Sequence, residues 1–269
     1  MLEKTFVHIP GIAYMTERRL WERGITDWAA ALACGTPPGS FSAARWGLVQ
    51  DTARDSAASL QSLDHRFFAR SLAPKDHWRA CRHFRHAVGY LDIETDGGYY
   101  GQAVTVVGIY DGTRTKSFVR GENLEAFADE IERYAMLVTF NGATFDLPLL
   151  RRAFPQVTFD QLHVDLRYML SKLGYRGGLK HIEREVGLAR DDDIAGFSGE
   201  DAVLLWNEHR RGSAEALELL LRYNAADVEN LERLLDMALP RLQADVQGAV
   251  ASRSDAGTRP CAPTRSSPE

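Results

Sequence analysis

The segment Tyr90–Thr95, with the sequence YLDIET, constrains the fold of this chain more than any other stretch. Its apolar residues predict a short buried strand, and a strand directs successive side chains to opposite faces. Asp92 and Glu94 therefore share one face, opposite Ile93. Two carboxylates that lose hydration side by side repel each other, and a divalent metal ion with oxygen ligands is the usual compensation. A solvated sheet edge explains the same pair equally well, so other acids must decide between the two interpretations.

The composition of the 269 residues predicts a globular protein without a global attraction for nucleic acid. Hydrophobic residues make up 45% of the chain, enough for a substantial core, and the formal net charge is -5. Any nucleic-acid binding must then come from local patches. The absence of a Cys-x-x-Cys pair argues against a zinc knuckle. No apolar leader and no run of membrane-spanning length is visible, so we expect a cytoplasmic monomer that does not bind a membrane.

The chain before residue 87 is expected to form two helical regions. In residues 1–35 a tight turn at residues 10–13, Pro-Gly-Ile-Ala, precedes two short helices. Residues 36–86 begin as a linker and continue as a helical segment rich in arginine, histidine and aromatic residues. Such a segment either follows a nucleic-acid backbone and stacks on bases, or is an amphipathic helix with a solvated basic face. The sequence favours neither alternative.

Residues 87–240 carry the pattern of an α/β domain. Three successive strands from residue 90 onward predict an antiparallel meander. A helix over residues 122–133 then leads to an apolar strand at Met136–Phe140, and this crossover implies parallel pairing. More helices follow, the last of them running from Ser213 to about Met237. We expect a mixed five-stranded sheet flanked by helices, and a disordered tail over residues 241–269.

Three polar residues downstream bear on the question of a site. Asp146 follows the strand at 136–140 and begins a helix, whose N-terminal partial charge favours an acid. A plain N-cap explains this residue when it is taken alone. Tyr223 and Asp227 lie four residues apart in the long helix and therefore project from one face. An exposed acid beside an amphipathic tyrosine is the competing interpretation.

Taken in order, these residues resemble the DEDD family of exonucleases on the ribonuclease-H-like fold. The resemblance rests on three motifs: the Asp-x-Glu strand, the acid at a strand-to-helix turn and the Tyr-x-x-x-Asp helix. The tyrosine in the last motif is similar to the branch of the family that has tyrosine in its third motif. The N-terminal part looks most like the YprB group of bacterial ribonuclease-H-like proteins. Its Pro-Gly-Ile turn also resembles a helix-hairpin-helix element, with Ala13 where a second glycine is usual. That turn either offers backbone N–H groups to a phosphate or only packs on its neighbour.

The resemblance implies a metal-dependent 3′–5′ exonuclease that hydrolyses DNA or RNA, acting on single-stranded ends. Two Mg²⁺ or Mn²⁺ ions would be held by four acids: Asp92, Glu94, Asp146 and Asp227. Asp92 would bridge the ions, Glu94 and Asp227 would hold the one that generates the attacking hydroxide, and Asp146 would reach the other through water. Tyr223 would position the water or the phosphate, because a neutral phenol is too weak a base at neutral pH.

Further residues follow from the same resemblance with less detail. The candidate substrate contacts are Thr95, Asn141, Lys180 and His181, and Asp165 is a neighbouring acid that supports the site. The alternative is a non-catalytic nucleic-acid-binding or scaffold protein that retains the ribonuclease-H-like fold. An intact set of repulsive acids favours the enzyme, because a protein that only binds has no use for them.

Overall fold

The structure is a computed structural model that describes residues 1–39, 41–98 and 102–251. They divide into two compact units. The larger unit is Arg85–Pro240, and the smaller consists of Met1–Phe84 and the C-terminal residues from Arg241 onward. Among the described residues, no helix combines the length and the apolar character needed to cross a membrane.

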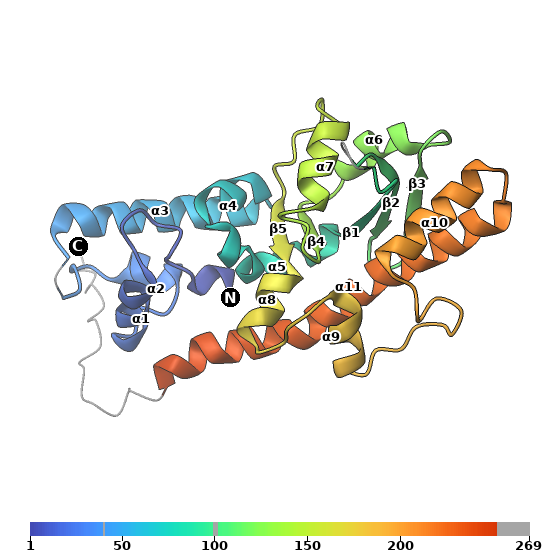
Figure 1. Ribbon diagram of the computed structural model, residues 1–269. Coiled ribbons are helices and arrows are strands. Elements are labelled where there is room, and N and C mark those ends of the chain that lie inside the picture. The colour runs from blue at the N-terminus through green and yellow to red at the C-terminus, as the bar shows by residue number, and fades with distance from the viewer. Residues whose placement is uncertain (40, 99–101, 252–269) are drawn as a thin grey trace. The chain divides into compact units, whose positions relative to one another are not determined.

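The larger unit is built on a five-stranded sheet with the strand order β3-β2-β1-β4-β5 (Figure 1). The strands are β1 (Val88–Thr95), β2 (Val104–Tyr110), β3 (Thr115–Val119), β4 (Met136–Thr139) and β5 (Leu162–Asp165). β1, β2 and β3 pair antiparallel, whereas β4 is parallel to β1 and to β5. The prediction of a mixed five-stranded sheet is confirmed. Because β1 lies inside the sheet and Glu94 is buried, the solvated-edge interpretation of its two acids is wrong.

Helices connect and flank these strands. They are η3 (Arg85–Ala87), η4 (Leu124–Ala126), α6 (Phe127–Ile131), α7 (Asp146–Ala153), α8 (Leu166–Lys172), α9 (Leu179–Glu185), α10 (Gly199–Arg210) and α11 (Ala214–Ala251). α11 continues past the expected start of a disordered tail at residue 241, because residues 241–247 are mostly good helix formers. The rest of that expected tail, residues 252–269, lies outside the described residues.

The two faces of the sheet are buried in separate cores. On one face Ile93 packs in a cluster with Phe127 of α6 and Leu150 of α7. On the other face Val106 of β2 belongs to a cluster with Trp206 of α10 and with α11. Alternation along β1 sends its apolar side chains into the first core and its acids toward α11.

α11 lies close to the sheet at Gly108 of β2, the residue paired with Asp92. A Cβ atom at position 108 would lie 1.9 Å from Oδ1 of Asn224 and 3.4 Å from Cγ1 of Val228. The Asn224 side chain is fully buried and cannot swing into solvent. Glycine is therefore required here by the space between strand and helix.

The smaller unit is helical. It contains η1 (Leu2–Lys4), α1 (Tyr14–Glu22), α2 (Trp28–Ala33), α3 (Ala43–Gln61), α4 (His65–Ser71), η2 (Pro74–Ala80), α5 (Cys81–Phe84) and the end of α11. Phe68, Trp78 and Phe84 of the basic and aromatic segment are buried, and the buried Arg79 pairs with Glu17 at 2.9 Å. These three rings form core and cannot stack on bases. With Arg79 buried as well, and with the segment divided into several short helices, it is not a single helix with a solvated basic face either.

We expect Gly108→Ala to destabilise the protein by about 1–3 kcal/mol, the usual cost of overpacking a core. The added methyl group must displace Asn224 and the part of α11 that carries it. Urea denaturation of the two proteins measures the difference. The control is Gly178→Ala, since a Cβ atom there meets no atom within 4 Å. Equal midpoints for Gly108→Ala and wild type would contradict the close approach.

Candidate metal centre

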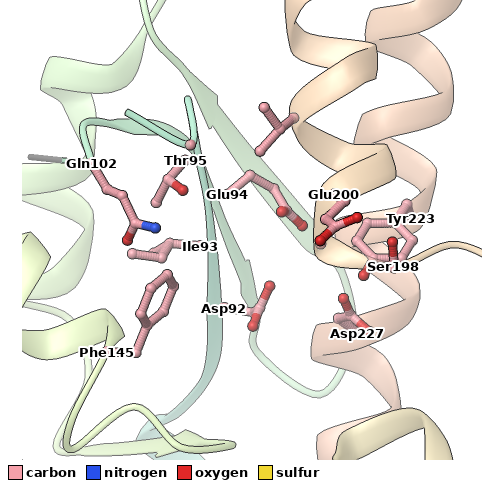
Figure 2. A pocket seen from close by; sticks show the side chains of 13 residues that line it. Asp92, Ile93, Glu94, Thr95, Gln102, Phe145, Ser198, Glu200, Tyr223 and Asp227 are labelled. Carbon is pink, nitrogen blue, oxygen red and sulfur yellow. The ribbon is translucent and has the colours of Figure 1, made fainter. Parts of the chain in front are cut away.

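Three carboxylates converge between β1 and α11. Asp92 and Glu94 project from β1 and Asp227 from α11, and one oxygen atom of each lies within 4.8 Å of the others. Figure 2 shows the two strand acids pointing toward the helix that carries Tyr223 and Asp227. The period of two along the strand and the spacing of four along the helix place these side chains on facing surfaces.

The cluster lies in a cavity of about 730 Å³. Thr95 of β1 and Phe145 of the β4–α7 connection line it, as do Ser198 and Glu200 at the start of α10 (Figure 2). Glu200 adds an exposed carboxylate that the sequence pattern did not single out. The acids therefore face a space that is open to a ligand.

Asp146 is buried in the first turn of α7. Phe145, not Asp146, is the N-cap, so the plain N-cap interpretation is wrong. The Oδ1 atom of Asp146 is buried and has no hydrogen-bond partner among the described residues. Asp146 is not one of the three acids that lie close enough together to bind one ion. Its negative charge still helps to raise the pKa of Asp92, although burial and the charge of Asp227 have larger effects.

The loop before Asp146 is held by Asp165. The backbone N–H groups of Asn141 and Ala143 donate to its carboxylate at 2.8 and 3.0 Å. The N–H of Arg167 donates to the same side chain, which caps α8. Asp165 thus anchors the β4–α7 loop.

Polar and basic side chains surround the acids. Nδ2 of Asn224 donates to Asp92 at 3.0 Å. Arg190, whose side chain is 4% exposed, donates to Glu183 at 2.7 Å and also to Asp227. These contacts offset part of the repulsion that the buried carboxylates would otherwise feel.

The electrostatics of the acids follow from burial first and mutual repulsion second. Burial, reinforced by Asp227, raises the pKa of Glu94 to about 8. Burial raises the pKa of Asp146 to about 7, against the opposing effect of backbone N–H groups. The pKa of Asp92 is raised well above its usual range by burial and by the neighbouring acids. Burial also raises the pKa of Asp227, although Arg190 opposes this shift.

Tyr223 is buried beside the acids and pairs with Lys180. Burial and the charge of Asp227 raise the pKa of its phenol, which stays protonated at neutral pH. Nζ of Lys180 donates to the phenol oxygen and lies 4.1 Å from the centre of the ring. Tyr223 can therefore donate a hydrogen bond into the cavity but cannot act as a base there.

The structure sorts the remaining sequence candidates. Thr95 lines the acidic cavity, and Lys180 reaches it through Tyr223. Asn141 instead lines a separate cavity of about 340 Å³, and the exposed His181 packs against Gly177. Neither Asn141 nor His181 is among the described residues that line the acidic cavity. The resemblance alone suggested these two residues; the loop that holds Asn141 and the exposed face of α9 that holds His181 direct them elsewhere.

Sequence reasoning missed Asn224 and Arg190. The signal for Asn224 is its position directly after Tyr223, three residues before Asp227 on the same helix. Arg190 lies in an irregular connection between α9 and α10 and carries no local pattern that would have identified it. Long connections of this kind are placed by tertiary packing.

The donor set fits hard divalent cations. Among the described residues, the members of this cluster are all carboxylates, with no thiolate or imidazole, as Mg²⁺ and Mn²⁺ prefer. The unpartnered Oδ1 of Asp146 adds an oxygen atom that needs a donor or a cation. Such an ion would be held by Asp92, Glu94 and Asp227.

Comparison with known proteins gives a family for the larger unit. Residues 89–239 match a family model described as the RNase_H superfamily. No curated protein matches the chain. Among solved structures, the chain is similar to the family B DNA polymerase from the hyperthermophilic archaeon Pyrobaculum calidifontis, with 19% identity and a TM-score of 0.48. That similarity covers 64% of this chain and 27% of the polymerase, so the chain spans about a quarter of its length.

We expect the metal-free protein to lose stability as the pH rises from about 5 to about 9. The folded pKa values of Glu94 (about 8) and Asp146 (about 7) lie above the unfolded values of about 4.3 and 3.9. Between the two sets of values the folded state binds more protons, so the free energy of unfolding falls with rising pH.

Thermal melts across this range in a chelating buffer measure the effect. Glu94→Gln should flatten the curve, because the variant has no carboxylate to ionise at that position. Adding Mn²⁺ to the wild type should restore stability at the alkaline end, since a ligand of the folded state stabilises it. A melting temperature that rises through this pH range in the chelating buffer would contradict the buried, repulsive cluster.

Proposed function

Because the chain belongs to the RNase_H superfamily, we propose that its acidic cavity hydrolyses phosphodiester bonds of nucleic acid with the help of divalent metal ions. The observation that supports this proposal is the convergence of Asp92, Glu94 and Asp227 within 4.8 Å, at a cavity between strand and helix. A fold gains no stability from three clustered acids, one half-buried and two buried, whose pKa values are raised. Bound cations would neutralise the repulsion among these carboxylates, which explains why the three lie together.

The residues of the acidic cavity have different roles in the proposed reaction. Asp92, Glu94 and Asp227 would hold the cations, and Asp146 would complete the set through water. Bound ions supply the charge that activates a water nucleophile and stabilises the leaving oxygen. Asn224 keeps the Asp92 carboxylate oriented by its hydrogen bond of 3.0 Å.

Tyr223 would position the attacking water or the phosphate. Its oxygen accepts a hydrogen bond from Lys180, so its own proton remains available for the cavity. Lys180 in this scheme acts through the tyrosine, and Thr95 borders the space that the substrate occupies. A buried, held donor of this kind is preorganised for a charged transition state.

The finer assignment rests on the order of the motifs in the sequence. An Asp-x-Glu strand, a later Asp and a Tyr-x-x-x-Asp helix support a 3′–5′ exonuclease of the DEDD type with two metal ions, and the N-terminal part with its Pro-Gly-Ile turn supports the YprB group. Such an enzyme would act on single-stranded ends of DNA or RNA. Degradation of end-labelled linear strands beside circular ones tests the requirement for an end, and the position of the label tests the direction.

One observation favours the alternative of a non-catalytic nucleic-acid-binding protein. Arg190 donates to Asp227, so a protein cation already occupies one side of a proposed metal ligand. In the catalytic case Arg190 keeps its bidentate contact with Glu183 and shares Asp227 with the ion. A Mn²⁺ titration separates the two cases, because a cluster neutralised by Arg190 alone has no affinity for the metal.

We expect Asp92→Asn to lower nuclease turnover by at least about 10²-fold, as the loss of several kcal/mol of charge stabilisation requires. The fold should be retained, and the metal-free melting temperature should not fall, because the substitution removes repulsion. Asp192→Asn, an exposed acid of the loop before α10, is the control. Full activity in Asp92→Asn would refute the proposed metal site.

Tyr223→Phe should reduce turnover by on the order of 10²-fold while Mn²⁺ affinity stays close to that of the wild type. The ring still packs in the core, and the hydroxyl alone is removed. Single-turnover cleavage beside a Mn²⁺ titration measures both quantities, with the exposed Tyr168→Phe as the control. Unchanged cleavage would show that Tyr223 has only a packing role, and a large loss of metal affinity would place its hydroxyl at the ion.

A further inference from the structure

A separate cavity of about 520 Å³ lies in the smaller unit and is lined by three arginines. Arg19 belongs to α1, Arg23 is the C-cap of that helix, and Arg45 lies in the first turn of α3. The hydroxyl-bearing Thr16 and the ring of Phe41 also line it. In the part of the chain that the structure describes, no aspartate or glutamate lines this arginine pocket.

The arginines of the pocket differ from their neighbours in pairing. Arg18 of the same helix forms an ion pair with Glu22 at 3.3 Å. Arg19 and Arg23 form no ion pair with any carboxylate among residues 1–39, 41–98 and 102–251. Like charges four residues apart on a helix repel each other. The partial negative charge at the C-terminus of α1 stabilises one nearby cation, but it does not explain why three arginines surround a single cavity.

One of the guanidinium groups is held by contacts within the protein, and a second lies beside the backbone at Gly39. Nη2 of Arg45 donates to the carbonyl of Gly11 at 2.6 Å, and the group lies 5.4 Å from the centre of the Phe41 ring. Arg23 lies so close to Gly39 that a Cβ atom there would be 2.1 Å from its Nη1. Side chains that are ordered before binding lose less entropy when a ligand arrives.

We propose that the arginine pocket binds phosphate groups of a nucleic-acid strand, an inference that rests on the proposed function of the acidic cavity. The planar fork of a guanidinium group matches phosphate oxygens in a bidentate geometry. The chain has a net charge of -5, so a polyanion must be attracted by a local basic site. The contact uses side chains, which distinguishes it from the backbone contact expected of the turn at residues 10–13.

The test compares binding with chemistry in the full-length protein. Fluorescence anisotropy in a chelating buffer measures binding of a single-stranded oligonucleotide at several salt concentrations. Hydrolysis of the p-nitrophenyl ester of thymidine 5′-monophosphate with Mn²⁺ reports on the acidic cavity alone. The variant is Arg19→Gln combined with Arg23→Gln, and its matched control is Arg54→Gln, an exposed arginine of α3 outside the pocket.

We expect the double variant to bind the oligonucleotide roughly 10-fold more weakly, with a salt slope reduced by about 0.7 for each phosphate that the protein no longer neutralises. Hydrolysis of the small ester should not change, and Arg54→Gln should behave like the wild type. The corresponding double lysine variant should keep most of the salt slope, because the slope depends on charge.

Three results overturn the proposal. The first is oligonucleotide binding and a salt slope that do not respond to the double variant. The second is an equal loss of affinity in Arg54→Gln. The third is stabilisation of the protein by inorganic phosphate without any oligonucleotide binding, which would place a free phosphate in the pocket. Arginine-dependent binding in a protein that hydrolyses no phosphodiester would instead contradict the proposed catalytic function and leave the pocket assigned.

Discussion

The repulsion between buried carboxylates on β1 is the constraint to which the larger unit is adapted. Asp92 and Glu94 cannot separate, because the strand holds them on one face and β2 pairs with it at both positions. Asn224 and Arg190 relieve part of the cost through hydrogen bonds to Asp92 and to Asp227. The raised pKa values of the acids show that the relief is incomplete. In the proposed function divalent cations would complete it, which would link the stability of the fold to its chemistry.

This arrangement depends on how closely the last helix approaches the sheet. Gly108 leaves the space that Asn224 fills, and the same contact brings Asp227 toward the strand acids. A second support lies across the sheet, where Asp165 at the end of β5 anchors the loop that leads to Asp146. The candidate site is thus assembled from a strand, a helix and an anchored loop, and each is placed by packing or hydrogen bonds outside the cavity.

The two units have cavities of opposite charge. The cavity of the larger unit is lined by carboxylates, which attract cations. The cavity of the smaller unit is lined by guanidinium groups, which attract anions. In the proposed hydrolysis of a polyanion both would contribute, because an acidic site repels phosphates until metal ions are bound. A separate basic pocket supplies binding free energy that does not compete with the chemistry.

Local periodicity decided what could be predicted from the sequence. The period of two places Asp92 and Glu94 on one face, the spacing of four places Tyr223 and Asp227 together, and the strand and helix order predicts the sheet. Tertiary structure alone decided that Arg190 meets Asp227, that Asn141 lines another cavity and that His181 faces solvent. Asn141 and Arg190 lie in loops, where side-chain direction depends on packing and not on a repeating geometry, and which face of α9 carries His181 into solvent depends on how that helix packs. The three arginines of the smaller unit illustrate the same division: their charge is visible in the sequence, but the cavity they share exists only after α1 and α3 have packed.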